Sequence, residues 1–159
     1  MKDPDDILNW RRINARLTTS GQPDALQLAD IQRLGVTHIV NTGPGHGEGA
    51  LETEAETVAR LGMVYIHIPV DFENPTDQNF EDFRSVLEAN SDKLIHVHCI
   101  YNARVSAFFY RYAKTNNEVS DEQAFEIMES IWRPGSDWAE FIGDQKAENV
   151  PNQYAGEDY

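Results

Sequence analysis

Residues 93–112 read KLIHVHCIYNARVSAFFYRY, and this stretch decides the fold. Its first part is a short apolar run that predicts a buried strand, and its second part continues at helical spacing. Cys99, the one cysteine of the sequence, therefore stands where a strand turns into a helix. The N–H groups at the start of a helix bind anions and stabilise a thiolate, so the turn predicts a nucleophile beside an anion site.

An arginine follows on the same turn. Arg104 comes five residues after Cys99, and the planar fork of a guanidinium grips an oxyanion through two hydrogen bonds. A nucleophile, a set of N–H groups and a cationic clamp within six residues indicate phosphoryl transfer through a cysteinyl-phosphate intermediate.

The segment from His98 to Ser106 resembles the phosphate loop of the cysteine-dependent protein tyrosine and dual-specificity phosphatases, which reads His-Cys, five residues, Arg, then Ser or Thr. The resemblance implies that Cys99 attacks phosphorus, that Arg104 binds the equatorial oxygens and that Ser106 eases departure of the thiolate. His98 is expected to hold the loop through its ring nitrogens. The remaining loop residues, which the resemblance implies bind the substrate, are Ile100, Tyr101, Asn102, Ala103 and Val105.

The loop departs from the family pattern at two positions. Asn102 stands where the family usually has glycine, and asparagine tolerates the left-handed conformation better than most residues. Four residues rather than five separate Cys99 from Arg104, and Val105 occupies the family's arginine position. Either the loop is one residue shorter, or the guanidinium enters one step early, rotated by about 100° around the helix.

A general acid is expected on the segment that follows the preceding strand. Residues 64–70 predict a strand, and residues 71–76 read DFENPT before a helix. Related phosphatases carry the acid on a mobile loop in this place. Asp71 is the first candidate, followed by Glu73 and Asp77, because the reaction needs a carboxyl group that protonates the leaving oxygen and then activates water.

The strand and helix patterns alternate along the chain, which predicts an α/β fold with a mostly parallel central sheet flanked by helices, as in protein tyrosine phosphatases. We expect strands at 17–22, 37–41, 64–70 and 94–98 and helices at 24–34, 51–61, 79–90, 104–115, 121–131 and 137–146. Residues 1–159 are expected to form a single phosphatase-like domain, with 147–159 as a loose C-terminal tail. Residues 16–23, RLTTSGQP, and the pattern up to residue 112 resemble bacterial phosphatase-like domains sometimes fused to β-lactamase-fold hydrolases.

A glycine-rich run and a pair of histidines indicate structural rather than catalytic roles. Residues 43–49 hold four glycines but lack the Lys-Ser/Thr of a nucleotide-binding P-loop, so we expect a flexible loop beside the active site. His96 and His98 project to one face of their strand, and we expect both to be hydrogen-bonded interior histidines. The predicted chemistry requires no metal and no organic cofactor.

The net charge of −14 argues against nucleic acid and anionic membranes as partners. A phosphorylated protein or small molecule is the expected substrate, and the sequence indicates neither the oligomeric state nor which monoester is bound. A cytoplasmic location is favoured, with a periplasmic one if a leader precedes these residues. Two alternatives to turnover stay open: a catalytically inactive phosphate-binding module, and a rhodanese-like sulfurtransferase that uses a persulfide on Cys99.

Overall fold

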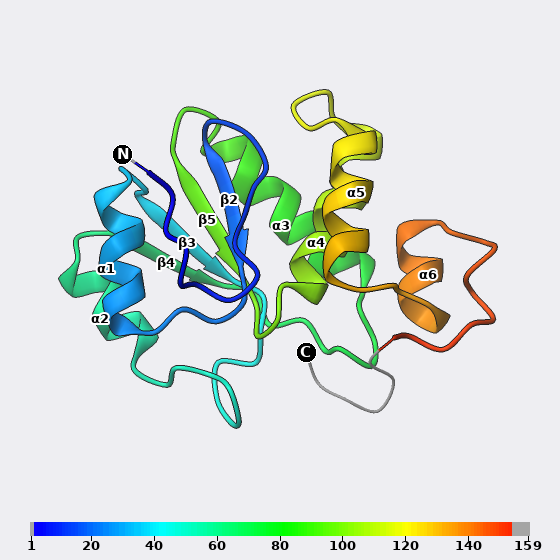
Figure 1. Cartoon of the computed structure of the whole chain (residues 1–159), viewed down its shortest axis with the longest axis horizontal. Helices are drawn as coiled ribbons and strands as arrows, with labels where there is room; N and C mark the ends of the chain where they lie inside the picture. The colour runs from blue at the N-terminus through cyan, green and yellow to red at the C-terminus, as the bar shows by residue number, and fades with distance from the viewer. Residues whose placement is uncertain (1, 154–159) are drawn as a thin grey trace.

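A computed structural model describes residues 2–153, in which five strands form one sheet with helices on both of its faces (Figure 1). The strands are β1 (Arg11–Arg12), β2 (Leu17–Ser20), β3 (His38–Asn41), β4 (Val64–His67) and β5 (Ile95–His98). The helices are α1 (Ala25–Arg33), α2 (Glu54–Arg60), α3 (Asp77–Ala89), α4 (Ala103–Thr115), α5 (Asp121–Ile131) and α6 (Ser136–Ile142).

The strands lie in the order β1-β2-β5-β3-β4, and all neighbours are parallel except β1 and β2. The predicted α/β fold with a mostly parallel sheet is therefore confirmed. β5 is the central strand, and Val97 pairs with Thr19 of β2 on one side and Val40 of β3 on the other. Ligands of such sheets bind beyond the carboxyl ends of the strands, which is where Cys99 follows β5.

Two apolar clusters fill the two faces of the sheet. Leu28 and Ile31 of α1 and Val58 of α2 pack with Ile39 of β3 in the smaller cluster. The larger cluster joins the other face to α3, α4, α5 and α6, which lie together on the opposite side of the sheet in Figure 1. Five aromatic residues are buried in this larger cluster, namely Phe108, Phe109, Tyr112, Trp132 and Trp138.

The helix boundaries follow from local capping chemistry. The Thr76 side chain accepts the backbone N–H of Asn79, and the Asn79 side chain accepts the backbone N–H of Thr76, so α3 begins at Asp77. The predicted helix at 137–146 ends early, at Ile142, because Gly143 takes a left-handed φ of 79° and stops it. The two-residue strand β1 was not predicted, since it is too short to show a periodic pattern.

The segment after α6 turns back onto the α5–α6 connection. The N–H of Ser136 donates to the Val150 carbonyl at 2.7 Å, and Arg133 and Gln153 exchange two hydrogen bonds. The rest of the expected C-terminal tail, residues 154–159, lies outside the described residues. Within residues 2–153, no helix combines the length and the apolar character that a bilayer crossing demands.

Candidate active site

Cys99 stands at the start of the short connection from β5 to α4, which we call the Cys loop (residues 99–102). The residue is completely buried, and its Sγ accepts the backbone N–H of Asn102 at 3.2 Å. The loop brings the sulfur next to the start of α4, where the first N–H groups of a helix have no partner within the helix. This arrangement is suited to binding an anion next to the sulfur.

The turn into α4 depends on Asn102, which has a φ of 76°. The prediction that asparagine takes the left-handed conformation at this position is confirmed. Its Nδ2 donates to the Asn9 carbonyl at 2.8 Å and to Thr19 Oγ1 at 3.0 Å, and both contacts are at least partly buried. Asn9 in turn donates from Nδ2 to the Tyr101 carbonyl at 2.8 Å. The N-terminal segment and β2 thus hold the Cys loop from outside.

Arg104 and Val105 occupy very different surroundings in the first turn of α4. Val105 is fully buried and belongs to the apolar core. Arg104 is also nearly completely buried, but its guanidinium carbon lies 5.2 Å from the centre of the Phe72 ring. It lines a cavity of about 330 Å³ together with Asp71. The arginine and the first acid candidate therefore meet at one cavity, while the residue at the family's arginine position packs in the core.

The segment that carries Asp71 is anchored by its neighbour. Phe72 is buried with its ring centre 5.6 Å from that of Trp132 and 5.7 Å from that of Trp138. Trp138 Nε1 donates to the Phe72 carbonyl at 2.7 Å, so α6 holds the segment in place. Asp71 itself is exposed, and its Oδ1 accepts the backbone N–H of Glu73 at 2.9 Å.

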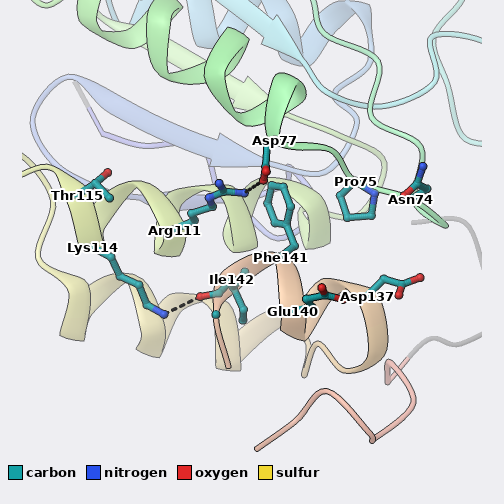
Figure 2. A pocket seen from close by; sticks show the side chains of 11 residues that line it. Asn74, Pro75, Asp77, Arg111, Lys114, Thr115, Asp137, Glu140, Phe141 and Ile142 are labelled. Carbon is teal, nitrogen blue, oxygen red and sulfur yellow. Dashed lines mark hydrogen bonds and ion pairs between the residues drawn. The ribbon is translucent and has the colours of Figure 1, made fainter. Parts of the chain in front are cut away.

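Asp77, the third acid candidate, belongs to a different part of the surface. Its Oδ1 accepts a hydrogen bond from Arg111 Nη1 at 3.0 Å, and both line a groove of about 600 Å³ between α3, α4 and α6 (Figure 2). The Arg111 guanidinium lies 4.4 Å from the Phe80 ring centre and 4.6 Å from that of Phe141. Of the three carboxylates, Asp71 is the one that lines the cavity of Arg104.

The Ser106 hydroxyl both donates and accepts a hydrogen bond. It donates to the Ala103 carbonyl at 3.0 Å and accepts from Trp132 Nε1 at 3.1 Å. Because its single proton is directed at Ala103, the hydroxyl must rotate before it donates to a departing Cys99 thiolate. The role that the resemblance gives to Ser106 stays a prediction.

Both histidines of β5 are hydrogen-bonded interior residues, as predicted. His96 lies between Thr18 Oγ1 and Ser20 Oγ, each at 2.8 Å. Burial, and secondly the nearby His98, hold the pKa of His96 well below its ordinary value. His98 Nδ1 donates to the Cys99 carbonyl at 3.0 Å, and its Nε2 lies 2.5 Å from Glu54 Oε2. Among the described residues, no group of three or more His, Cys, Asp or Glu side chains is arranged to hold a metal ion.

The glycine-rich segment 43–49 lies directly against the Cys loop. A Cβ on Gly43 would stand 3.4 Å from the Cys99 Cα, and one on Gly49 would stand 3.1 Å from an Ile100 methyl carbon. His67 Nε2 donates to the Gly43 carbonyl at 2.8 Å. His46 of the same segment lines the cavity of Asp71 and Arg104. The segment therefore forms one wall of the candidate site.

Glu54 and His46 are site residues that sequence reasoning missed. Glu54 is one of several acids between residues 52 and 56, and only its burial sets it apart. His46 lies in a run read as a loop, and the sequence contains no signal that would single it out.

Comparison with known proteins gives structural relatives only. No family model and no curated protein matches the sequence. A crystal structure of a "Putative phosphatase (DUF442)" from Shewanella putrefaciens CN-32 is 27% identical, with a TM-score of 0.78 over 87% of this chain and 91% of that one. TpbA of P. aeruginosa, solved in complex with pTyr, is 19% identical, with a TM-score of 0.65 over 80% of this chain and 76% of that one.

The core catalytic domain of the PP-IP phosphatase SIW14 from S. cerevisiae is 14% identical, with a TM-score of 0.70 over 92% of this chain and 96% of that one. These likenesses confirm, at the level of the fold, the resemblance to the cysteine-dependent tyrosine and dual-specificity phosphatases.

Proposed function

We propose that this chain, which has the fold of the protein-tyrosine-phosphatase-like phosphatases, hydrolyses phosphomonoesters through a cysteinyl-phosphate intermediate. The observation that carries the proposal is the cavity of about 330 Å³ that Arg104 and Asp71 line together with His46, whose segment packs against the Cys loop. A cationic clamp and an acid at one cavity, together with a thiol at a helix start, are the groups that a two-step displacement at phosphorus needs.

In the first step, the Cys99 thiolate attacks phosphorus, the S–P bond forms and the P–O bond to the leaving group breaks. The Asn102 N–H, which donates to the sulfur at 3.2 Å, supports the thiolate before attack. Arg104 and the N–H groups of residues 100–105 bind the equatorial oxygens, on which negative charge is held in the transition state. His98 holds the Cys99 carbonyl and so keeps the loop in register.

Asp71 supplies the proton for the departing alkoxide or phenoxide and becomes a carboxylate. In the second step, this carboxylate removes a proton from water, whose oxygen attacks the phosphoenzyme. The S–P bond then breaks, phosphate leaves and the thiolate is restored. A rotated Ser106 hydroxyl donates to the sulfur as it departs. Asp71 regains in the second step the proton that it gave up in the first, and water is the one co-reactant.

Proteins of this fold handle more than one class of phosphorylated compound. TpbA was crystallised with pTyr and SIW14 is a PP-IP phosphatase, so relatives of this fold include proteins that act on, or bind, quite different phosphate esters. We propose a phosphorylated protein or small molecule as substrate. With a net charge of −14 on the whole chain, attraction of such an anion must come from local groups such as Arg104.

Hydrolysis of p-nitrophenyl phosphate in the presence of a chelator, over about pH 5 to 8, tests the proposal. We expect metal-independent turnover that the C99S variant loses while it still binds tungstate. R104A should lose both turnover and tungstate affinity. R111A is the matched control, because Arg111 also stacks on aromatic rings but lines the groove of Figure 2. If R104A is as active as R111A, Arg104 is not the residue that binds the oxyanion.

A phosphate-binding module without turnover is the second candidate. Two observations favour it: Cys99 is completely buried, and the Ser106 proton is directed at the Ala103 carbonyl. Tungstate binding by a wild-type protein that hydrolyses no p-nitrophenyl phosphate would select this alternative over the phosphatase.

A further inference from the structure

Glu54 is a carboxylate in an unusual place. It is the first residue of α2 and is 1% exposed, although its neighbour Glu56 on the same helix is exposed. Its Oε2 lies 2.5 Å from His98 Nε2, and its Oε1 accepts a hydrogen bond from Gln22 Nε2 at 3.0 Å. A buried acid of this kind is retained in a fold only if it is paired, and its partner here adjoins Cys99.

The hydrogen-bond partners constrain where the protons lie. His98 Nδ1 faces the Cys99 carbonyl at 3.0 Å, and a carbonyl only accepts, so Nδ1 carries a proton. Glu54 Oε1 is an acceptor, because the group that reaches it is the Gln22 amide N–H. The remaining contact, from His98 Nε2 to Glu54 Oε2, is 2.5 Å long, so one proton lies between this nitrogen and this oxygen. An imidazolium that donates from Nδ1 to the carbonyl and from Nε2 to the carboxylate gives a partner to both ring nitrogens and, with the Gln22 amide, to both carboxylate oxygens.

Two ionisable groups near this pair, His96 and Tyr65, favour their neutral forms. His96, whose ring centre lies 6.4 Å from that of His98, has a pKa held well below its ordinary value by burial and then by His98. Tyr65 accepts a hydrogen bond from Asn41, and burial, with a smaller contribution from Glu54, raises the pKa of its hydroxyl. Glu54 is therefore the carboxylate that is hydrogen-bonded directly to His98.

We propose that Glu54 is a positioning residue of the candidate site, which holds His98 as an imidazolium with its positive end towards the Cys loop. This inference rests on the proposed function, because it gives the ion pair a role in binding the oxyanion. His98 then fixes the Cys99 carbonyl through Nδ1, and its charge adds to the attraction that Arg104 exerts on the anion. The carboxylate of Glu54 stands behind His98, further from the loop than the charge it balances.

The E54Q variant tests the inference, because glutamine keeps the shape and the hydrogen bonding but not the charge. E56Q, on the exposed side of the same helix, is the matched control. Long-range ¹H–¹⁵N spectra of the five histidine rings report how many nitrogens of His98 carry a proton. Calorimetric titration with tungstate at low ionic strength reports the affinity of the loop for an oxyanion.

We expect wild type and E56Q at pH 7 to show both His98 nitrogens protonated, and E54Q to show a proton on Nδ1 alone. E54Q should bind tungstate about three- to tenfold more weakly, the size of effect that a charge pair several ångströms away exerts at the effective dielectric of protein interiors. The wild-type spectrum alone decides the charge state if E54Q does not fold, and a neutral His98 in wild type overturns the inference.

An E54Q protein with an unchanged His98 spectrum, or with wild-type tungstate affinity, also overturns the role of Glu54 but leaves the proposed function standing. If the wild-type protein binds no tungstate, the oxyanion site of the proposed function is refuted, and the role of Glu54 in that site is refuted with it.

Discussion

Replacing Asn102 tests how the turn between Cys99 and α4 is held. The residue combines a φ of 76° with two hydrogen bonds from Nδ2, to the Asn9 carbonyl and to Thr19 Oγ1. The N102G variant keeps the left-handed backbone without strain but deletes both bonds. The N102A variant deletes the same bonds and also brings a Cβ without a compensating polar group into the left-handed region.

The two variants should differ by a predictable amount. Two lost hydrogen bonds at about 0.5–1.5 kcal/mol each lower the free energy of unfolding of N102G by about 1–3 kcal/mol. In N102A the left-handed conformation costs a further ~1–2 kcal/mol. About 0.4–1 kcal/mol of this is offset, because alanine leaves the unfolded chain less freedom than glycine does. N102A should therefore be about 1 kcal/mol less stable than N102G.

Urea unfolding followed by circular dichroism measures both differences, and the melting temperature of N102A should lie about 2–4 °C below that of N102G. Equal stability of the two variants would show that the left-handed turn relaxes when the side chain is removed. A glycine variant as stable as wild type would show that the bonds to Asn9 and Thr19 contribute nothing. Either result would refute the idea that Asn102 holds the turn through both its backbone conformation and its side-chain hydrogen bonds.

Two further predictions concern acids. D71N should lower kcat for p-nitrophenyl phosphate by about 10²- to 10⁴-fold, the usual effect of losing a general acid. E73Q should retain kcat, because the bond to Asp71 comes from its backbone N–H; equal losses in both variants would assign the acid elsewhere. The hydrogen bond from Arg16, partly opposed by burial, holds the pKa of Glu118 below its ordinary value of 4.5. The Glu118 carboxylate thus stabilises the fold above that pH, and its contribution is lost as the pH falls through the lowered pKa. In acid unfolding monitored by fluorescence, E118Q should lose less stability than wild type between about pH 5 and 3, whereas E122Q should follow wild type; parallel curves for E118Q and wild type would contradict this.

The sequence predicted the sheet and the position of Cys99 because both depend on local patterns. A short apolar run followed by helical spacing specifies β5 and α4, whatever these elements pack against. Gly143 marks the C-terminal end of α6, although the polar and apolar pattern continues beyond it. The left-handed turn at Asn102 was also predictable, since few residue types tolerate that conformation.

Contacts between distant segments were not predictable in the same way. Glu54 is one of several acids in its stretch of sequence, and only the packing of α2 against the sheet turns this one towards His98. The spacing of Arg104 left two arrangements open, because the side chain it meets, Phe72, comes from another strand connection. Such contacts depend on the tertiary arrangement, which period and propensity do not encode.

The bond from Trp138 Nε1 to the Phe72 carbonyl joins residues 66 positions apart, and it sets an order of assembly. During synthesis at about 5–20 residues per second, β5 and the Cys loop leave the ribosome before α6 does. A nascent chain that ends within α5 already contains the thiol, the arginine and the acidic residue of the candidate site, but not the indole that anchors the segment of Asp71. Until α6 docks, the segment of Asp71 lacks the hydrogen bond from Trp138.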